Sequence, residues 1–241
     1  MNILLLDIET SPSTAYVWGI FKENIPLARV IDTSRVLCYS HKWYGDKDAQ
    51  WHRGEKLEII HKALTDADVV VHYNGRHFDI PILNREFLKK GMFPPAPYKQ
   101  VDLLKVVRDQ FRFLSNKLAH VAKELGLGEK GDTDFQLWVD CMNDVPEAWE
   151  KMKKYNIQDV NLLEKLYDRL MPWIKSHPNH ALYYPIGATV CPNCGGHHIH
   201  RRGYAYTTAL KYQRFQCQDC GTWFRGVKAE KEVRRTYASI V

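Results

Sequence analysis

The chain has 241 residues, of which 45% are hydrophobic and 26% charged, and its formal net charge is +6. This length allows one large domain, or a medium domain with a small one. Because there is no apolar run of about 18 residues and no basic, signal-like start, we expect no membrane span and no cleaved signal peptide. Six cysteines, four of them in CxxC pairs, fit a reducing compartment better than a disulfide scaffold, so the expected location is the cytoplasm, or the host cytoplasm if a virus encodes the chain.

The positive charge is concentrated toward the C-terminus. From Cys191 onward, nine Lys and Arg residues accompany three acidic residues, so residues 1–190 are formally neutral. A basic segment attached to a neutral body suggests a polyanionic partner, although a solvated basic surface would have the same composition.

The first half of the chain alternates predicted strands and helices. Runs rich in β-branched and aromatic residues predict strands at 2–9, 17–21, 36–43 and 67–74. Apolar spacing predicts a helix at 56–64, and a second helix is expected at 79–91. In that second helix Asp79 suits the N-cap, Pro81 the first turn and Gly91 the C-cap.

The second half is mainly helical. After a proline-rich loop at 94–97, helices are predicted at 102–111, 116–125 and 147–171. Asp102 is expected to cap the first of these. Strands that alternate with helices and then give way to helices predict an α/β fold with a mixed sheet.

Carboxylates follow two of the predicted buried strands. Asp7 and Glu9 are two residues apart, so they share one face of the strand end, and Asp79 follows the strand at 67–74. Tyr155 and Asp159 are neighbours on one helical face. Each piece alone has an ordinary structural explanation: a strand entering solvent, a helix cap, or an amphipathic surface. Clustered carboxylates, however, repel one another unless cations join them, and Mg²⁺ or Mn²⁺ prefer oxygen ligands.

Three segments resemble a known family. LDIET (6–10), YNGRHFDIPIL (73–83) and YNIQDV (155–160) are similar, in order and spacing, to the motifs of the DEDD superfamily of 3′–5′ exonucleases, which are DnaQ-like with an RNase H-like fold. The Tyr-x-x-x-Asp form is that of the DEDDy branch, and the likeness is closest to proofreading domains of family B DNA polymerases. KLAHVAKELGL (117–127) also resembles a segment of those domains.

The resemblance implies a 3′–5′ exonuclease that releases nucleoside monophosphates. The implied ligands of two Mg²⁺ or Mn²⁺ ions are Asp7, Glu9, Asp79 and Asp159. It further implies that Tyr155 positions the attacking water and that Asn74 and Phe78 hold the 3′-terminal nucleotide, with core packing the alternative for Phe78. The expected substrate is DNA with a single-stranded or frayed 3′ end, and RNA is the alternative. No polymerase domain follows in this sequence, so we expect a free-standing exonuclease.

Two CxxC pairs lie near the C-terminus, at 191–194 and 217–220, and a glycine follows each. Separated by a hairpin-sized insert, they predict a tetrahedral structural zinc site, whereas a pair of redox motifs is the alternative. The ligands would be Cys191, Cys194, Cys217 and Cys220. Cys38 and Cys141 are expected to be ordinary buried or half-buried residues, and the nearby histidines (His197, His198 and His200) to lie on the surface or to face nucleic acid.

Residues 191–226 resemble the zinc ribbons at the start of many bacterial transposases, which implies nucleic-acid binding. Basic residues alternate there with aromatic ones, so cations can contact phosphates and rings can stack on bases. The candidate contacts are Arg201, Arg202 and Arg214. The rings can instead form the ribbon's own core, and the ribbon can instead dock a replication or repair protein.

The expected organisation has four parts. An RNase H-like exonuclease domain occupies 1–175, a linker 176–187, a zinc ribbon 188–227 and a basic tail 228–241. For the chain as a whole, a non-catalytic nucleic-acid-binding adaptor is the alternative from another functional class.

Overall fold

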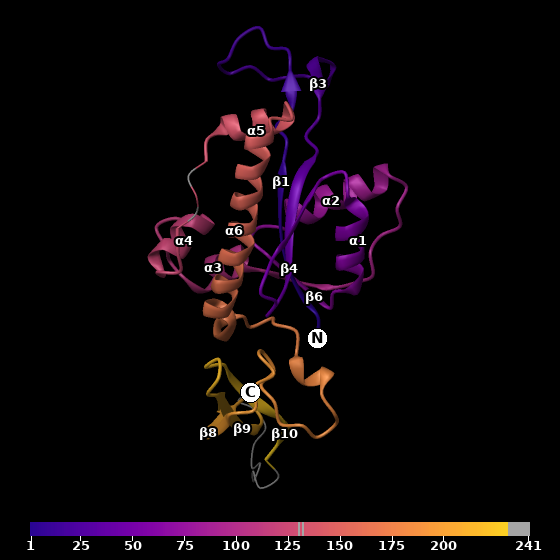
Figure 1. Cartoon of the computed structure of the whole chain (residues 1–241). Helices are drawn as coiled ribbons and strands as arrows, with labels where there is room; N and C mark the ends of the chain where they lie inside the picture. Colours follow the sequence, from indigo (N-terminus) through magenta and orange to yellow (C-terminus); the bar gives the residue numbers. More distant parts are fainter. Residues whose placement is uncertain (130, 132, 231–241) are drawn as a thin grey trace. The chain divides into compact units, whose positions relative to one another are not determined.

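The computed structural model describes residues 1–129, 131 and 133–230 (Figure 1). It divides into two compact units, which are Asn2–Tyr167 and, with Met1, the residues from Asp168 onward. Most of the predicted basic tail, residues 231–241, lies outside the described residues.

A mixed sheet is the centre of the first unit. Among the described residues it has five strands in the order β5-β4-β1-β6-β7. β1 pairs in parallel with β6 and antiparallel with β4, β6 pairs in parallel with β7, and β4 pairs antiparallel with β5. The bounds are β1 Ile3–Thr10, β4 Val36–Trp43, β5 Gln50–Arg53, β6 Val69–His72 and β7 Lys99–Asp102. The predicted α/β fold with a mixed sheet is confirmed.

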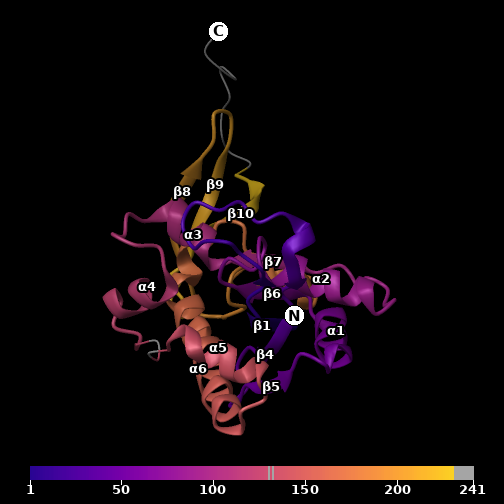
Figure 2. The ribbon, with the colours of Figure 1, turned by 90° about the horizontal axis from the view of Figure 1, so that it is seen from above.

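Helices cover both faces of this sheet (Figure 2). α1 (Leu57–Asp66) and α2 (Asp79–Lys89) pack on the face that carries Leu4, Leu6 and Ile8 of β1. α5 (Phe135–Met142) and α6 (Pro146–Leu170) pack on the other face. Because side chains alternate along a strand, Asp7 and Glu9 point away from the α1–α2 face.

The remaining predicted helices are also present. α3 is Leu103–Gln110 and α4 is Leu118–Glu124. Asp102 caps α3 as predicted, because its side chain accepts the backbone N–H of Leu104 at 3.0 Å. α2 ends slightly earlier than expected: Lys90 is its C-cap, and Gly91 follows with a φ of 68°.

The predicted strand at 17–21 is wrong. These residues belong to a loop between two short paired strands, β2 (Thr14–Ala15) and β3 (Val30–Asp32), and a 3₁₀ helix at Leu27–Arg29 precedes β3. The carboxylate of Glu23 accepts the N–H groups of Trp18 and Gly19, at 3.1 and 3.0 Å. A side chain therefore occupies backbone donors that a strand would offer to its neighbour.

The predicted N-cap role of Asp79 is also wrong. Phe78 is the N-cap of α2, and Asp79 is the first helical residue. Its carboxylate instead accepts the N–H of Ile8 in β1, at 3.1 Å. This tertiary hydrogen bond replaces the local one.

The second unit contains an antiparallel sheet. In the part that the structure describes, its three strands lie in the order β10-β9-β8, with bounds β8 Ile199–Tyr206, β9 Lys211–Cys217 and β10 Trp223–Ala229. Two 3₁₀ helices, Met171–Trp173 and His180–Tyr183, precede it. Across the described part of the chain, no helix is both long and apolar enough to cross a bilayer.

Candidate functional site

Three carboxylates converge on the side of β1 that faces α6. One oxygen from each of Asp7, Glu9 and Asp159 lies within 4.8 Å of the other two. Asp7 and Glu9 share a face of β1, and α6 supplies Asp159, which is only 1% exposed. Such a set repels itself when ionised, and a hard divalent cation with oxygen ligands relieves the repulsion. The donor set therefore fits Mg²⁺ or Mn²⁺.

Asp79, the fourth predicted ligand, is not one of these three. It is buried, and its hydrogen bond to Ile8 places its carboxylate beside the segment of β1 that separates Asp7 from Glu9. Burial raises the pKa of Asp79 to about 7. A cation bound next to it would favour the charged form of this carboxyl group.

Two hydrogen-bond donors not identified from the sequence hold this cluster in place. The buried Nδ2 of Asn156 donates to Asp7 Oδ2 at 2.7 Å. The indole Nε1 of Trp138 in α5 donates to Glu9 Oε2 at 3.0 Å. The Trp138 ring also meets Tyr155 edge-on, with ring centroids 5.9 Å apart. Donors of this kind fix the orientation of ligand carboxylates.

The loop after β6 presents the residues predicted to hold a nucleotide. Asn74 has a φ of 68°, in the left-handed region, and its N–H donates to Asp102 Oδ1 at 2.9 Å. It borders a cavity of about 570 Å³ that Arg108 and Lys117 also line. Phe78 is 43% exposed, which argues against the core-packing alternative.

A second cavity, of about 530 Å³, opens beside Tyr155. Lys151 and Lys154 of α6 line it as well. Tyr155 is 8% exposed and lies one helical turn before Asp159. Lysines that line a cavity together with Tyr155 suit a polyanion, since they can contact its phosphates while the acids hold metal ions.

Residues 4–171 match the sequence profile of the RNase H superfamily. The chain belongs to this superfamily. Its members are generally nucleases, so the first unit is an RNase H-like nuclease domain. No curated protein matches the sequence.

The structure of the family B DNA polymerase from the hyperthermophilic archaeon Pyrobaculum calidifontis is similar, with a TM-score of 0.53 and 18% identity. The similarity covers 71% of this chain and 24% of the polymerase chain. At this identity it shows a shared fold.

In the RNase H-like domain, Trp138→Phe is expected to lower kcat about 10-fold, because Glu9 loses its indole donor while the aromatic packing remains. Trp149→Phe is the matched control, since the Nε1 of Trp149 donates to Asp144, 3.1 Å away and outside the cluster. Steady-state kinetics on a short oligonucleotide compares the two. Equal rates for both variants would show that the donor to Glu9 is unimportant.

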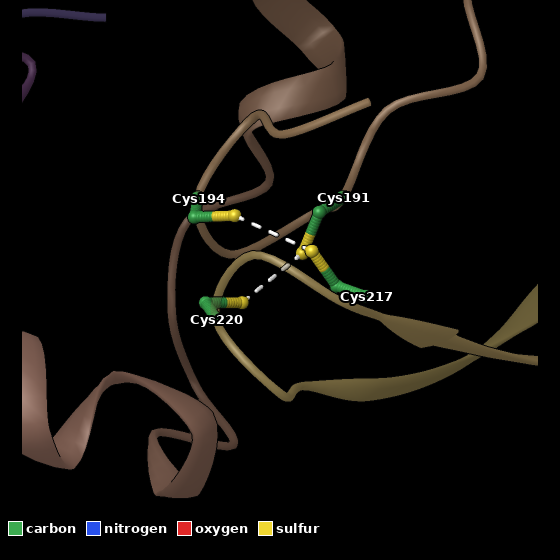
Figure 3. A group of neighbouring side chains, drawn as sticks. All are labelled: Cys191, Cys194, Cys217 and Cys220. Atoms are coloured by element: carbon green, nitrogen blue, oxygen red, sulfur yellow. Dashed lines mark hydrogen bonds between the residues drawn. The ribbon is translucent and has the colours of Figure 1, made fainter. Parts of the chain in front are cut away.

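The four cysteines of the second unit lie together (Figure 3). The Sγ atoms of Cys191 and Cys220 are 3.6 Å apart, and those of Cys194 and Cys217 are 3.7 Å apart. A zinc ion with Zn–S bonds of about 2.3 Å sets tetrahedral S···S edges near 3.8 Å. None of the six cysteines forms a disulfide, and Cys38 and Cys141 are buried as predicted. The arrangement is consistent with a zinc ribbon.

The surroundings of this cluster fit metal binding better than redox chemistry. Gly195 and Gly221, which follow the two pairs, have φ values of 73° and 82°. A side chain at these positions would be strained, so the glycines permit the tight turns that present the thiols. The nearby histidines (His197, His198 and His200) are exposed, as expected.

The ribbon sheet displays cations over aromatic rings. Arg214 lies 5.0 Å from the ring centroid of Trp223, and Arg225 lies 3.9 Å from that of Tyr212. Arg214 and Arg225 are direct cross-strand partners. The other predicted contacts, Arg201 and Arg202, are exposed on β8.

Other rings of the ribbon pack on each other, as the alternative interpretation requires. Phe215 and Phe224 stack with centroids 5.5 Å apart. The aromatic residues are therefore divided between a small core and a cationic surface.

Proposed function

We propose that the RNase H-like domain is a metal-dependent 3′–5′ exonuclease that acts on DNA with a single-stranded or frayed 3′ end and releases nucleoside monophosphates. The convergence of Asp7, Glu9 and Asp159 supports this function most directly. With Asp79 they form the proposed ligand set for two Mg²⁺ or Mn²⁺ ions. Bound ions there supply an activated water and charge stabilisation at the leaving oxygen.

The remaining site residues position the substrate and the water. Tyr155 lies one helical turn before Asp159 and borders a cavity, where its hydroxyl can orient the attacking water. Asn74 and Phe78 are the proposed contacts of the 3′-terminal nucleotide, since an amide can hydrogen-bond to it and an exposed ring can stack on its base. Lys151 and Lys154 provide positive charge for its phosphates.

The ribbon supplies substrate affinity in this proposal. Four thiolates hold one structural zinc ion, and the ribbon's arginines contact the polymer backbone. Like charges placed directly opposite each other destabilise a sheet, so the pairing of Arg214 with Arg225 favours a bound phosphate between or beside them. Tethering the polymer in this way raises the effective concentration of its 3′ end at the nuclease domain.

The test is a cleavage assay on 5′-labelled single-stranded DNA, duplex DNA and RNA, with Mg²⁺ or Mn²⁺ and with Asp7→Asn as control. We expect a ladder that shortens from the 3′ end of single-stranded DNA and is absent with the variant. Preferential cleavage of RNA would show that the substrate is RNA and not DNA. Retained binding without cleavage of any substrate would favour the adaptor alternative.

A further inference from the structure

The segment that joins β1 to β4 displays a concentration of exposed aromatic and aliphatic side chains. We call residues 14–32, from β2 to β3, the aromatic hairpin. Tyr16 is 74% exposed, Trp18 90%, Ile20 83% and Phe21 84%. Large apolar side chains gathered on one surface mark a binding site more often than scattered ones do.

Hydrogen bonds and an ion pair within the aromatic hairpin hold its backbone while these side chains stay exposed to solvent. Glu23 accepts hydrogen bonds from the N–H groups of Trp18 and Gly19 and also forms an ion pair with Arg29. Arg29 in turn accepts the N–H of Tyr16 through its backbone carbonyl, at 3.0 Å. These contacts give the N–H groups of Tyr16, Trp18 and Gly19 acceptors within the hairpin itself, so these three groups need no partner in the domain core.

The base of the aromatic hairpin is fixed to the strand that carries the acidic pair. Ser11, two residues after Glu9, donates its N–H to Arg35 O at 2.9 Å, and its Oγ accepts the N–H of Arg35 at 3.0 Å. The hairpin extends from the end of the sheet at which β1 ends (Figure 1). The base of the aromatic hairpin is therefore fixed two residues beyond Glu9 of the proposed metal site.

We propose that the aromatic hairpin is a stacking platform for unpaired bases of the strand being degraded, on the 5′ side of the scissile bond. This inference rests on the proposed function, because the strand whose 3′ end enters the carboxylate site must leave it past neighbouring surfaces. Trp18 is eight residues beyond Thr10, a reach of at most about 29 Å. At about 3.4 Å per nucleotide, the platform lies within roughly eight nucleotides of the site.

The chemistry of the segment favours bases over another protein surface. Tyr16, Trp18 and Phe21 offer flat rings, and stacking on a base contributes about 1–3 kcal/mol and tolerates any sequence. The tip also carries Lys22 beside Phe21, whereas the nearest acid, Glu23, is paired with Arg29. A ring and an adjacent cation match a base and its phosphate.

The experiment compares Trp18→Ala/Phe21→Ala with Ile20→Ala in the full chain. Ile20 is as exposed as Phe21 and lies in the same loop, so its variant removes apolar area without removing a ring. Affinity for a single-stranded 12-mer is measured with Asp7→Asn added to each protein, so that nothing is cleaved. We expect the double variant to bind at least about 10-fold more weakly and Ile20→Ala to bind within about 3-fold of the parent.

A second readout separates this inference from the proposed function. The p-nitrophenyl ester of thymidine 5′-monophosphate is too short to reach the hairpin, so the double variant should hydrolyse it at the wild-type kcat/KM. If the wild type cleaves neither the ester nor DNA, the proposed function fails, and 12-mer affinity alone decides the role of the hairpin. Unchanged 12-mer affinity in the double variant overturns the platform. Ile20→Ala that weakens 12-mer affinity as much as the double variant also overturns it. A double variant that loses only self-association overturns it too, and would assign the surface to a second copy of the chain.

Discussion

Asp7→Asn is expected to lower the rate of phosphodiester hydrolysis by about 10³-fold or more while the protein stays folded and binds DNA almost normally. Asparagine keeps the shape of the side chain, and its oxygen can still accept the hydrogen bond from Asn156. What is lost is a negative charge from the group of three carboxylates. Metal ions contribute several kcal/mol of charge stabilisation in the transition state, and about 4 kcal/mol corresponds to this rate.

The measurement is the rate of phosphodiester hydrolysis by the wild type and by Asp7→Asn, with Mg²⁺ and with Mn²⁺. Thermal unfolding of both proteins is measured in the absence of metal. Asp48→Asn is the matched control, because Asp48 is an exposed acid of the same domain outside the cluster. The metal-free variant should unfold at the same or a higher temperature than the wild type, since charge repulsion in the cluster decreases. A rate that stays within 10-fold of the wild type would remove Asp7 from the proposed ligand set.

The acidic cluster shows what sequence patterns can and cannot predict about a site. The two-residue spacing of Asp7 and Glu9 was enough to place both on one face, because strand alternation is local. Asp79 was assigned a local role as a helix cap, whereas its carboxylate bonds to Ile8 in a strand far away in the sequence. A side chain that can satisfy either a local or a distant donor cannot be assigned from its neighbours.

The residues that orient the carboxylates illustrate the same limit. Asn156 lies inside the third motif, next to Tyr155, yet the motif alone did not show that its side chain donates to Asp7. Trp138 had no such signal, because its bond to Glu9 joins α5 to β1 across most of the domain. Contacts of this kind depend on how helices pack on the sheet, which periodicity does not specify.

The fold was predictable where burial and period agreed, as in β1, β6 and α6. The prediction of a strand at 17–21 was wrong because these residues have the apolar composition of a buried strand, whereas they are exposed in the part of the chain that the structure describes. β5 was missed for the opposite reason: it is an edge strand with the polar sequence QWHR, and edge strands need no apolar alternation. Composition therefore predicts a strand where apolar residues are exposed in a loop, and misses a strand where polar residues form the edge of a sheet.

Cys191→Ser is expected to abolish stoichiometric zinc binding and to weaken affinity for single-stranded DNA by about 10²-fold, while hydrolysis of the small nitrophenyl ester continues at the wild-type rate. Structural zinc contributes about 10–16 kcal/mol to the folding of small metal-binding peptides, so a ribbon that loses a ligand loses its sheet. The arginine pair would then no longer be presented, and the gain from tethering disappears. Residues 2–167 form a compact unit of their own, which is why their chemistry should persist.

Zinc content, oligonucleotide affinity and ester hydrolysis are measured together on the full chain. Cys141→Ala is the matched control, because Cys141 is a buried cysteine of the RNase H-like domain, outside the four-cysteine cluster. That variant should keep one equivalent of zinc and its affinity for DNA. If Cys191→Ser loses zinc but binds DNA as tightly as the wild type, the ribbon does not bind the substrate, and the docking of a replication or repair protein becomes the better account of its exposed arginines and rings.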